Sequence, residues 1–142
     1  MHPGHIGLRV RDLAASQRFY EALGFTESLH LELPDKIAAG LLGLEQPIGF
    51  EAVYITNGAF VLQLIGFSGH PAPDEGERSM VNAGLTHLSI LVDDVPAAVA
   101  TVTEAGGSVP ADFEGGFACL VRDPDGQLIE LLDQSMRPLA AQ

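Results

Sequence analysis

Hydrophobic positions along the chain follow two periodicities, and each pattern occurs twice. Short runs of large and β-branched apolar residues predict strands, whereas apolar residues spaced by three and four predict helices. The segment HIGLRVRDLAASQRFYEALGF, beginning at His5, predicts a strand, an acidic turn, a helix and a glycine stop. The segment HLSILVDDVPAAVATVTEAGG, beginning at His87, aligns with it without a gap and predicts the same elements. The chain therefore contains an internal repeat.

Capping residues mark the ends of both predicted helices. Asp12 and Asp94 stand where an N-cap is needed, and Pro96 follows in the first turn of the second helix, where proline is tolerated. Gly24 and the pair Gly106-Gly107 suit left-handed stops. Both helices are thus bounded by local signals.

A second pair of segments also repeats. The run FVLQLI (60–65) corresponds to QLIELL (127–132), and each follows a turn, TNG (56–58) or DPDG (123–126). Another apolar run, FEAVYI or FACLVR, precedes each turn. Each half therefore predicts the order β-α-β-β-β, and the fold class is α+β with two tandem βαβββ modules.

The modules are expected at about 4–67 and 85–134 of a single domain covering 1–142, with a Gly- and Pro-rich linker at about 68–84. The first module carries extra material, LPDKIAAGLLGLEQPIG, which is compatible with a short helix around Ile37 to Leu42. This insertion is either a lid that walls a substrate pocket or a packed connector.

Composition narrows the classes of function. Hydrophobic residues make up 46% and charged residues 18%, which predicts a packed core. The formal net charge of −12 argues against nucleic acid or an anionic membrane as a partner. No apolar run reaches the roughly 18 residues of a membrane span, and no signal peptide is evident, so a cytoplasmic protein is expected. The one cysteine, Cys119, is expected to be buried and inert.

Four polar residues occupy equivalent places in the two copies. His5 and His87 begin the first strands, and Gln63 and Glu130 lie near the middle of the last strands. A carboxylate within Leu128 to Leu132 is costly to bury unless it is paired or bound to a metal. Alone, each residue has an ordinary structural explanation. As a repeat-related set they predict a site for one divalent ion, such as zinc, nickel, cobalt, manganese or iron.

The sequence resembles the vicinal oxygen chelate superfamily, which includes glyoxalase I, methylmalonyl-CoA epimerase, extradiol dioxygenases and bleomycin-binding proteins. The resemblance rests on HIGLRVRDLAASQRFYEALGF, GLTHLSILVDDVPAAV and DPDGQLIELL. It implies an incomplete, cupped β-barrel with helices outside. It also implies metal ligands at His5, Gln63, His87 and Glu130, a set most similar to that of methylmalonyl-CoA epimerase.

The resemblance further implies that the metal polarises a substrate chelated through adjacent oxygens, so that an enediolate or enolate forms while a nearby base moves a proton. Glu130 could be that base if it can leave the metal. Glu51 is the other candidate. A two-residue turn at Asn57-Gly58 would point Glu51 away from Gln63, whereas a turn at Thr56-Asn57 with a bulge at Gly58 would place both on one face.

Arg9 shares a strand face with His5, and its counterpart in glyoxalase I helps to hold a substrate carboxylate, although a structural salt bridge is the competing role. His30 and His70 are expected to be surface residues, but a dioxygenase would need one of them near the metal.

Three functions remain open at this point. The leading one is a metal-dependent isomerase, epimerase or lyase, the second is an Fe(II) extradiol-type dioxygenase, and the third is a metal-free protein that binds a natural product. The partner is expected to be a small molecule, and a homodimer is expected because modules of this kind leave open sheet edges.

Overall fold

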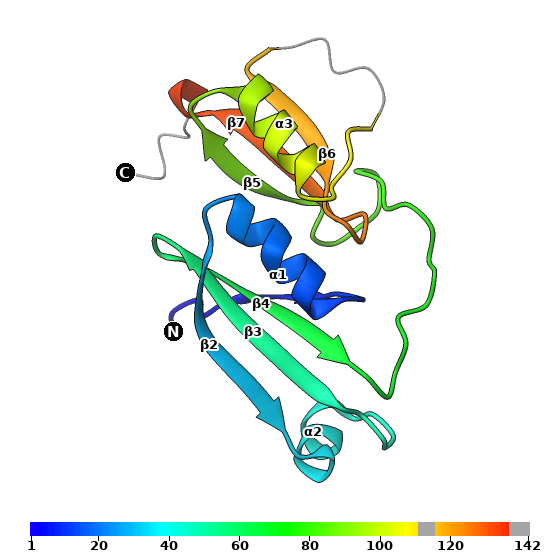
Figure 1. The fold of residues 1–142 in the computed structure, drawn as a ribbon. Coiled ribbons are helices and arrows are strands. Elements are labelled where there is room, and N and C mark those ends of the chain that lie inside the picture. Colours follow the sequence, from blue (N-terminus) through cyan, green and yellow to red (C-terminus); the bar gives the residue numbers. More distant parts are fainter. Residues whose placement is uncertain (111–115, 137–142) are drawn as a thin grey trace. The chain divides into compact units, whose positions relative to one another are not determined.

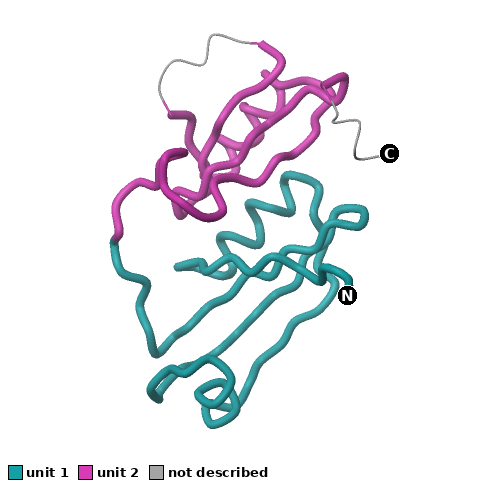
Figure 2. The backbone as a smooth tube through the Cα atoms, turned by 180° about the vertical axis from the view of Figure 1, so that it is seen from behind, with its two compact units in different colours: residues 1–74 teal, residues 75–142 magenta. Residues whose placement is uncertain are grey.

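The computed structural model describes residues 1–110 and 116–136. The chain divides into two compact units, Met1–Asp74 and Glu75–Gln142 (Figure 2). Their boundary falls within the linker predicted at about 68–84.

The first unit is built on a four-stranded sheet in the order β1-β4-β3-β2 (Figure 1). β1 (Ile6–Arg9) runs parallel to β4 (Phe60–Phe67). β3 (Phe50–Asn57) lies antiparallel between β4 and β2 (Thr26–Leu33). α1 (Leu13–Ala22) connects β1 to β2 and packs on β3 and β4, as a parallel pair separated by a helical crossover requires.

α1 covers one face of this sheet. Phe19 and Tyr20 of α1 are 0% exposed, as are Ile55, Leu62 and Leu64 of the strands. Ile55 pairs with Leu62, and side chains alternate along a strand, so these strand residues share one face. We call it the helix face.

The insertion after β2 forms α2 (Asp35–Leu42), which confirms the helix predicted around Ile37 to Leu42. Ala38 of α2 is fully buried in a cluster with Ile48, Phe50 and Ala52. Phe50 and Ala52 alternate with the helix-face residues of β3, so α2 covers part of the opposite face. We call this opposite face, to which Gln63 also belongs, the ligand face.

The turn between β3 and β4 differs from both predicted turns. Asn57 pairs with Phe60, so Gly58 and Ala59 form the two-residue turn. Gly58 has a φ of 57°, the positive value that the first position of such a turn demands. In this register Tyr54 is the partner of Gln63.

The second unit contains a three-stranded sheet in the order β5-β7-β6. β5 (His87–Val92) runs parallel to β7 (Leu128–Asp133), and β6 (Ala118–Arg122) is antiparallel to β7. α3 (Val95–Glu104) packs on β6 and β7, and a short 3-10 helix, η1 (Gln134–Met136), follows β7. The pairing of first with last strand repeats that of β1 with β4, as the sequence repeat predicts.

The strand expected after the second helix is represented by one bridge between Ser108 and Arg122. Residues 111–115, which follow shortly after Ser108, lie outside the described residues. The α+β class is confirmed, and neither described sheet closes into a barrel. Within the described ranges, no helix is long and apolar enough to cross a membrane. Cys119 is buried as predicted, and desolvation raises the pKa of its thiol.

Candidate metal centre

In the second unit, the structure brings His87 and Glu130 together. Nε2 of His87 lies 3.7 Å from Oε2 of Glu130, and both side chains are partly exposed. They share a sheet face because His87 pairs with Leu128, two residues before Glu130 on β7. This face is the one not covered by α3, because the alternate residues Ile129 and Leu131 are fully buried.

Neighbouring side chains hold both groups. Nδ1 of His87 is 2.9 Å from the hydroxyl of Thr86, which leaves Nε2 as the nitrogen directed at Glu130. The Ser89 hydroxyl donates a 2.8 Å hydrogen bond to Oε2 of Glu130. Partners of this kind fix the tautomer and orientation of metal ligands in proteins.

In the first unit, Tyr54 links His5 and Gln63. Gln63 is 8% exposed, and its Nε2 donates a 2.7 Å hydrogen bond to the Tyr54 hydroxyl. The ring of His5, just before β1, meets the Tyr54 ring edge-on, with centroids 5.2 Å apart. The imidazole of the second unit thus lies close to a carboxylate, and that of the first unit contacts the tyrosine that also binds Gln63.

These donors fit a divalent metal ion. The Gln63 nitrogen is engaged by Tyr54, so its carbonyl oxygen is the atom left for a cation. The imidazole nitrogen and the carboxylate of the second unit lie 3.7 Å apart, and an imidazole with an oxygen donor suits a borderline divalent ion.

The structure does not bring Glu51 together with Gln63. Glu51 pairs with Gly66, which faces Leu13 of α1, whereas Gln63 belongs to the ligand face. The hairpin register thus places Glu51 on the helix face, contrary to the alternative in which the two shared a face. Its carboxylate lies 2.8 Å from Nε2 of His30.

His30 and Glu51 belong to a cluster that the sequence did not indicate. Their ligand atoms and a carboxylate oxygen of Glu32 all lie within 4.8 Å of one another. The three residues are neighbours because β2 and β3 pair Glu32 with Glu51 and His30 with Val53. A cavity of about 480 Å³, lined by His30, Glu51 and residues of the start of α1, opens beside them.

Arg9 is engaged by the backbone of its own unit. Its guanidinium donates to the carbonyls of Ile65, Phe67 and His70, at 3.3, 3.4 and 2.9 Å, and contacts the Val10 carbonyl. It also lies 4.8 Å from the centroid of the Phe67 ring. These contacts tie β1 to the end of β4, and substrate binding by Arg9 stays a prediction.

His70 has a structural contact as well. Its Nε2 lies 2.6 Å from the carbonyl of Glu45, between the segment after β4 and the insertion that contains α2. Neither His30 nor His70 is therefore placed beside Gln63 by the first unit, since the contact of His30 is with Glu51 on the helix face.

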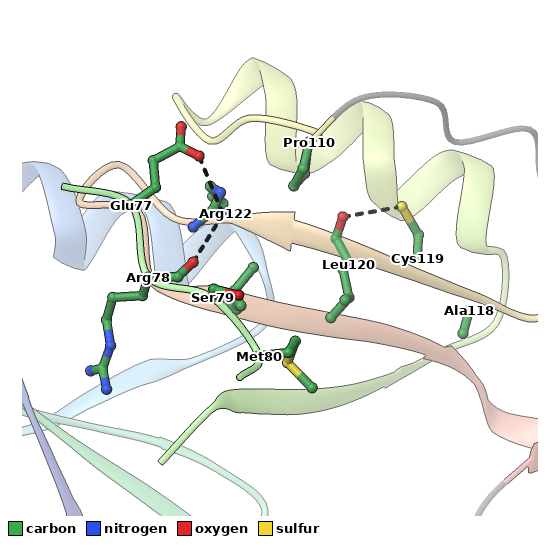
Figure 3. A pocket seen from close by; sticks show the side chains of 10 residues that line it. Glu77, Arg78, Ser79, Met80, Pro110, Ala118, Cys119, Leu120 and Arg122 are labelled. Carbon is green, nitrogen blue, oxygen red and sulfur yellow. Dashed lines mark hydrogen bonds and ion pairs between the residues drawn. The ribbon is translucent and has the colours of Figure 1, made fainter. Parts of the chain in front are cut away.

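A cavity of about 600 Å³ lies in the second unit, lined by β6 and by the segment from Glu77 to Met80 (Figure 3). Leu120 and Leu128 contribute to its wall. Leu120 pairs with Glu130, so the cavity borders the same sheet face as the His87–Glu130 pair. Its lining is mostly apolar, which suits the non-reacting part of a small organic molecule.

Arg122 holds the segment that walls this cavity. Its guanidinium donates to the carbonyl of Gly126 at 2.9 Å and to that of Arg78 at 3.1 Å. It also forms an ion pair with the Glu77 carboxylate (Figure 3), with a nitrogen-to-oxygen distance of 3.6 Å. One side chain from β6 thus fixes both the turn before β7 and the cavity wall.

Several of these residues were missed from the sequence. Ser89 follows His87 by two positions on one strand, so alternation alone could have indicated it. Arg122, at the end of the apolar run FACLV, was a visible polar residue without an assigned role. Tyr54 could be found only from the register of β3 with β4.

The fold is shared with glyoxalase family proteins, and sequence comparison agrees. Residues 2–131 match the Glyoxalase/Bleomycin resistance protein/Dioxygenase superfamily, and the chain belongs to that superfamily. The resemblance drawn from the three motifs is thereby confirmed.

Similar proteins include an uncharacterised bacterial relative, YaeR of Escherichia coli (strain K12). It is 30% identical over 137 residues, which cover 92% of this chain and 94% of the relative. Trypanothione-dependent glyoxalase I of Leishmania major is 27% identical with a TM-score of 0.68, over 92% of this chain and 85% of that one.

Two further solved structures share the fold at lower identity. A glyoxalase family protein of Bacillus cereus has a TM-score of 0.80 at 18% identity, over 94% of this chain and 93% of that one. The fosfomycin resistance protein FosX of Mesorhizobium loti has a TM-score of 0.62 at 17% identity, over 99% and 98% of the two chains.

Proposed function

We propose that the protein is a metal-dependent isomerase, epimerase or lyase acting on a small molecule with two neighbouring oxygens. In this proposal His5, Gln63, His87 and Glu130 hold one divalent ion. The observation that supports it most is that three of the proposed ligands are oriented by hydrogen bonds with neighbouring side chains. Thr86 directs the His87 ring, Ser89 holds Glu130, and Tyr54 engages the nitrogen of Gln63.

The bound ion would supply Lewis-acid polarisation of a substrate oxygen next to the carbon that loses its proton. Glu130 would accept that proton through a carboxylate oxygen that has left the ion, while the Ser89 hydroxyl donates to its Oε2 oxygen. Glu51 is left out of this machinery because it lies on the helix face, paired with His30. The cavity lined by Leu120, the strand partner of Glu130, would hold the apolar part of the substrate away from water.

The dioxygenase alternative has less support. It needs Gln63 to stay off the metal and a histidine near the metal to serve as acid or base. Yet the Gln63 side chain is hydrogen-bonded to Tyr54 on the ligand face. His30 contacts Glu51 on the helix face instead. The metal-free binding alternative leaves unexplained why polar partners orient donors in both units.

Metal uptake is the first test. We expect purified protein stripped of metal to bind about one equivalent of Co²⁺ or Zn²⁺, followed by the Co²⁺ absorption bands and by elemental analysis. His87→Ala should weaken binding at least about tenfold, because it removes an imidazole ligand. His70→Ala is the matched histidine control and should bind as the wild type does. Equal affinity in all three proteins would contradict the ligand assignment.

Proton exchange is the second test. The loaded protein should exchange a substrate C–H proton with deuterated buffer, with no uptake of oxygen. A hemithioacetal is the first compound to try, because the Leishmania major relative is a trypanothione-dependent glyoxalase I, followed by 2-oxo acids and acyl-CoA thioesters. Glu130→Gln should slow exchange by about 10²- to 10⁴-fold. Oxygen consumption with catechols after Fe²⁺ loading would favour the dioxygenase instead.

A further inference from the structure

One side chain of the first unit contacts both of its proposed ligands. The Tyr54 hydroxyl accepts a 2.7 Å hydrogen bond from Nε2 of Gln63, and the Tyr54 ring meets the His5 ring at 79° with centroids 5.2 Å apart. Tyr54 comes from β3, His5 precedes β1 and Gln63 belongs to β4. Tyr54 therefore connects two ligands that stand on different segments.

The hydrogen bond leaves one end of the Gln63 amide turned away from Tyr54. In the structure the amide nitrogen donates to the phenol oxygen, so Nε2 faces Tyr54 and Oε1 faces elsewhere. A side chain at Gly7 would begin 3.5 Å from Oε1 of Gln63. The carbonyl oxygen is thus turned toward β1, which His5 precedes.

Tyr54 is also packed against the core of its own unit. Tyr54 packs against the buried cluster of Ala38, Ile48, Phe50 and Ala52, which α2 closes. The insertion that distinguishes the first unit from the second therefore contacts the residue that contacts both ligands. It packs against Tyr54, whose hydroxyl contacts Gln63 and whose ring contacts His5.

We propose that Tyr54 is the positioning residue of the metal site: it presents Gln63 Oε1 to the ion through its hydroxyl and restrains His5 through its ring. This inference rests on the proposed function, because it assumes that Gln63 and His5 bind metal. It goes beyond that function by assigning the orientation of the two first-unit ligands to Tyr54 and to the cluster, including Ala38 of α2, against which Tyr54 packs.

The test compares Tyr54→Phe with Tyr54→Leu. Phenylalanine keeps the ring but loses the acceptor of the Gln63 N–H, so Co²⁺ affinity should fall about tenfold. Leucine also removes the ring beside His5 and should weaken binding further. Ser28→Ala is the control, since the Ser28 hydroxyl donates a 3.1 Å hydrogen bond to the Tyr54 carbonyl and contacts neither ligand in the interactions described. It should retain wild-type affinity.

A double-mutant cycle separates positioning from a general structural effect. If Tyr54 acts through Gln63, then Tyr54→Phe should change the affinity of a Gln63→Ala protein by less than about twofold. A tenfold loss in both backgrounds would overturn the inference. In the metal-free protein, the side-chain amide NMR signals of Gln63 should shift in Tyr54→Phe and stay unchanged in Ser28→Ala.

The outcomes distinguish this inference from the proposed function. A wild-type protein that binds metal, with Tyr54→Phe binding equally well, would overturn the role of Tyr54 and leave the four-ligand site standing. A wild-type protein that binds no metal would overturn both. Unchanged Gln63 amide signals in Tyr54→Phe would overturn the positioning role without any metal being present.

Discussion

Close backbone approaches at single residues fix the connector that follows β4. The Gly69 N–H donates to the carbonyl of Ile48 at 2.9 Å. Ile48 belongs to the buried cluster that contains Ala38 of α2, so this hydrogen bond joins the connector to that cluster. A Cβ at Gly69 would lie 2.0 Å from the carbonyl oxygen of Pro47. The approach is therefore possible only where the residue has no side chain.

Gly69→Ala should destabilise the protein by about 1 to 3 kcal/mol, because the backbone of Pro47 must move to admit the methyl group. Gly40→Ala is the matched control. Gly40 lies within α2 and nothing would contact its Cβ, so alanine should raise stability by about 0.5 to 1 kcal/mol. Urea unfolding measures both free energies, and equal effects of the two substitutions would contradict this explanation.

At the scale of elements, the helices of both repeat copies begin with an aspartate N-cap. The Asp12 carboxylate accepts the Ala15 N–H, and the Asp94 carboxylate accepts the Ala97 N–H, each at 2.9 Å. Both caps were predicted from the sequence, and the structure confirms them. Each helix follows the strand that begins at or directly after a proposed histidine ligand, β1 after His5 and β5 at His87.

Asp94→Ala should lower the free energy of unfolding by about 1 kcal/mol, since it leaves an N–H of the first turn of α3 without its acceptor. Asp94→Asn keeps a side-chain oxygen at the cap and should lose much less. Urea titrations monitored by circular dichroism give both values. Asparagine and alanine proteins of equal stability would show that the cap contributes nothing.

At the scale of the whole molecule, the proposed ligands are divided between the two compact units. His5 and Gln63 belong to one unit, and His87 and Glu130 to the other. A ligand that binds only the folded state stabilises every element that carries its contacts. The ion should therefore stabilise both halves of the chain.

Hydrogen exchange measured by mass spectrometry tests this expectation. Adding Zn²⁺ to the metal-free protein should slow amide exchange in β1 and β4 as well as in β5 and β7. The same addition to His87→Ala should give much weaker protection in both units. Protection restricted to one unit would indicate that the ion is held by that unit alone, against the four-ligand proposal.

The sequence by itself determined the repeat, the strand and helix order of the first unit, both helix caps and the short helix of the insertion. These features follow from hydrophobic periodicity and capping residues, which act within a few positions of the chain. It also identified the set of four polar residues, of which the structure brings His87 close to Glu130 and places His5 and Gln63 each in contact with Tyr54.

Only the tertiary structure decided which side chains surround those residues. The sequence allowed turns at Asn57-Gly58 or Thr56-Asn57, whereas the chain turns at Gly58-Ala59 and pairs Tyr54 with Gln63. A change of register by one residue reverses the face of every side chain, and register depends on packing against α1 and α2, which are distant in sequence. That choice placed Glu51 with His30 on the helix face and gave Tyr54 its position beside the ligands.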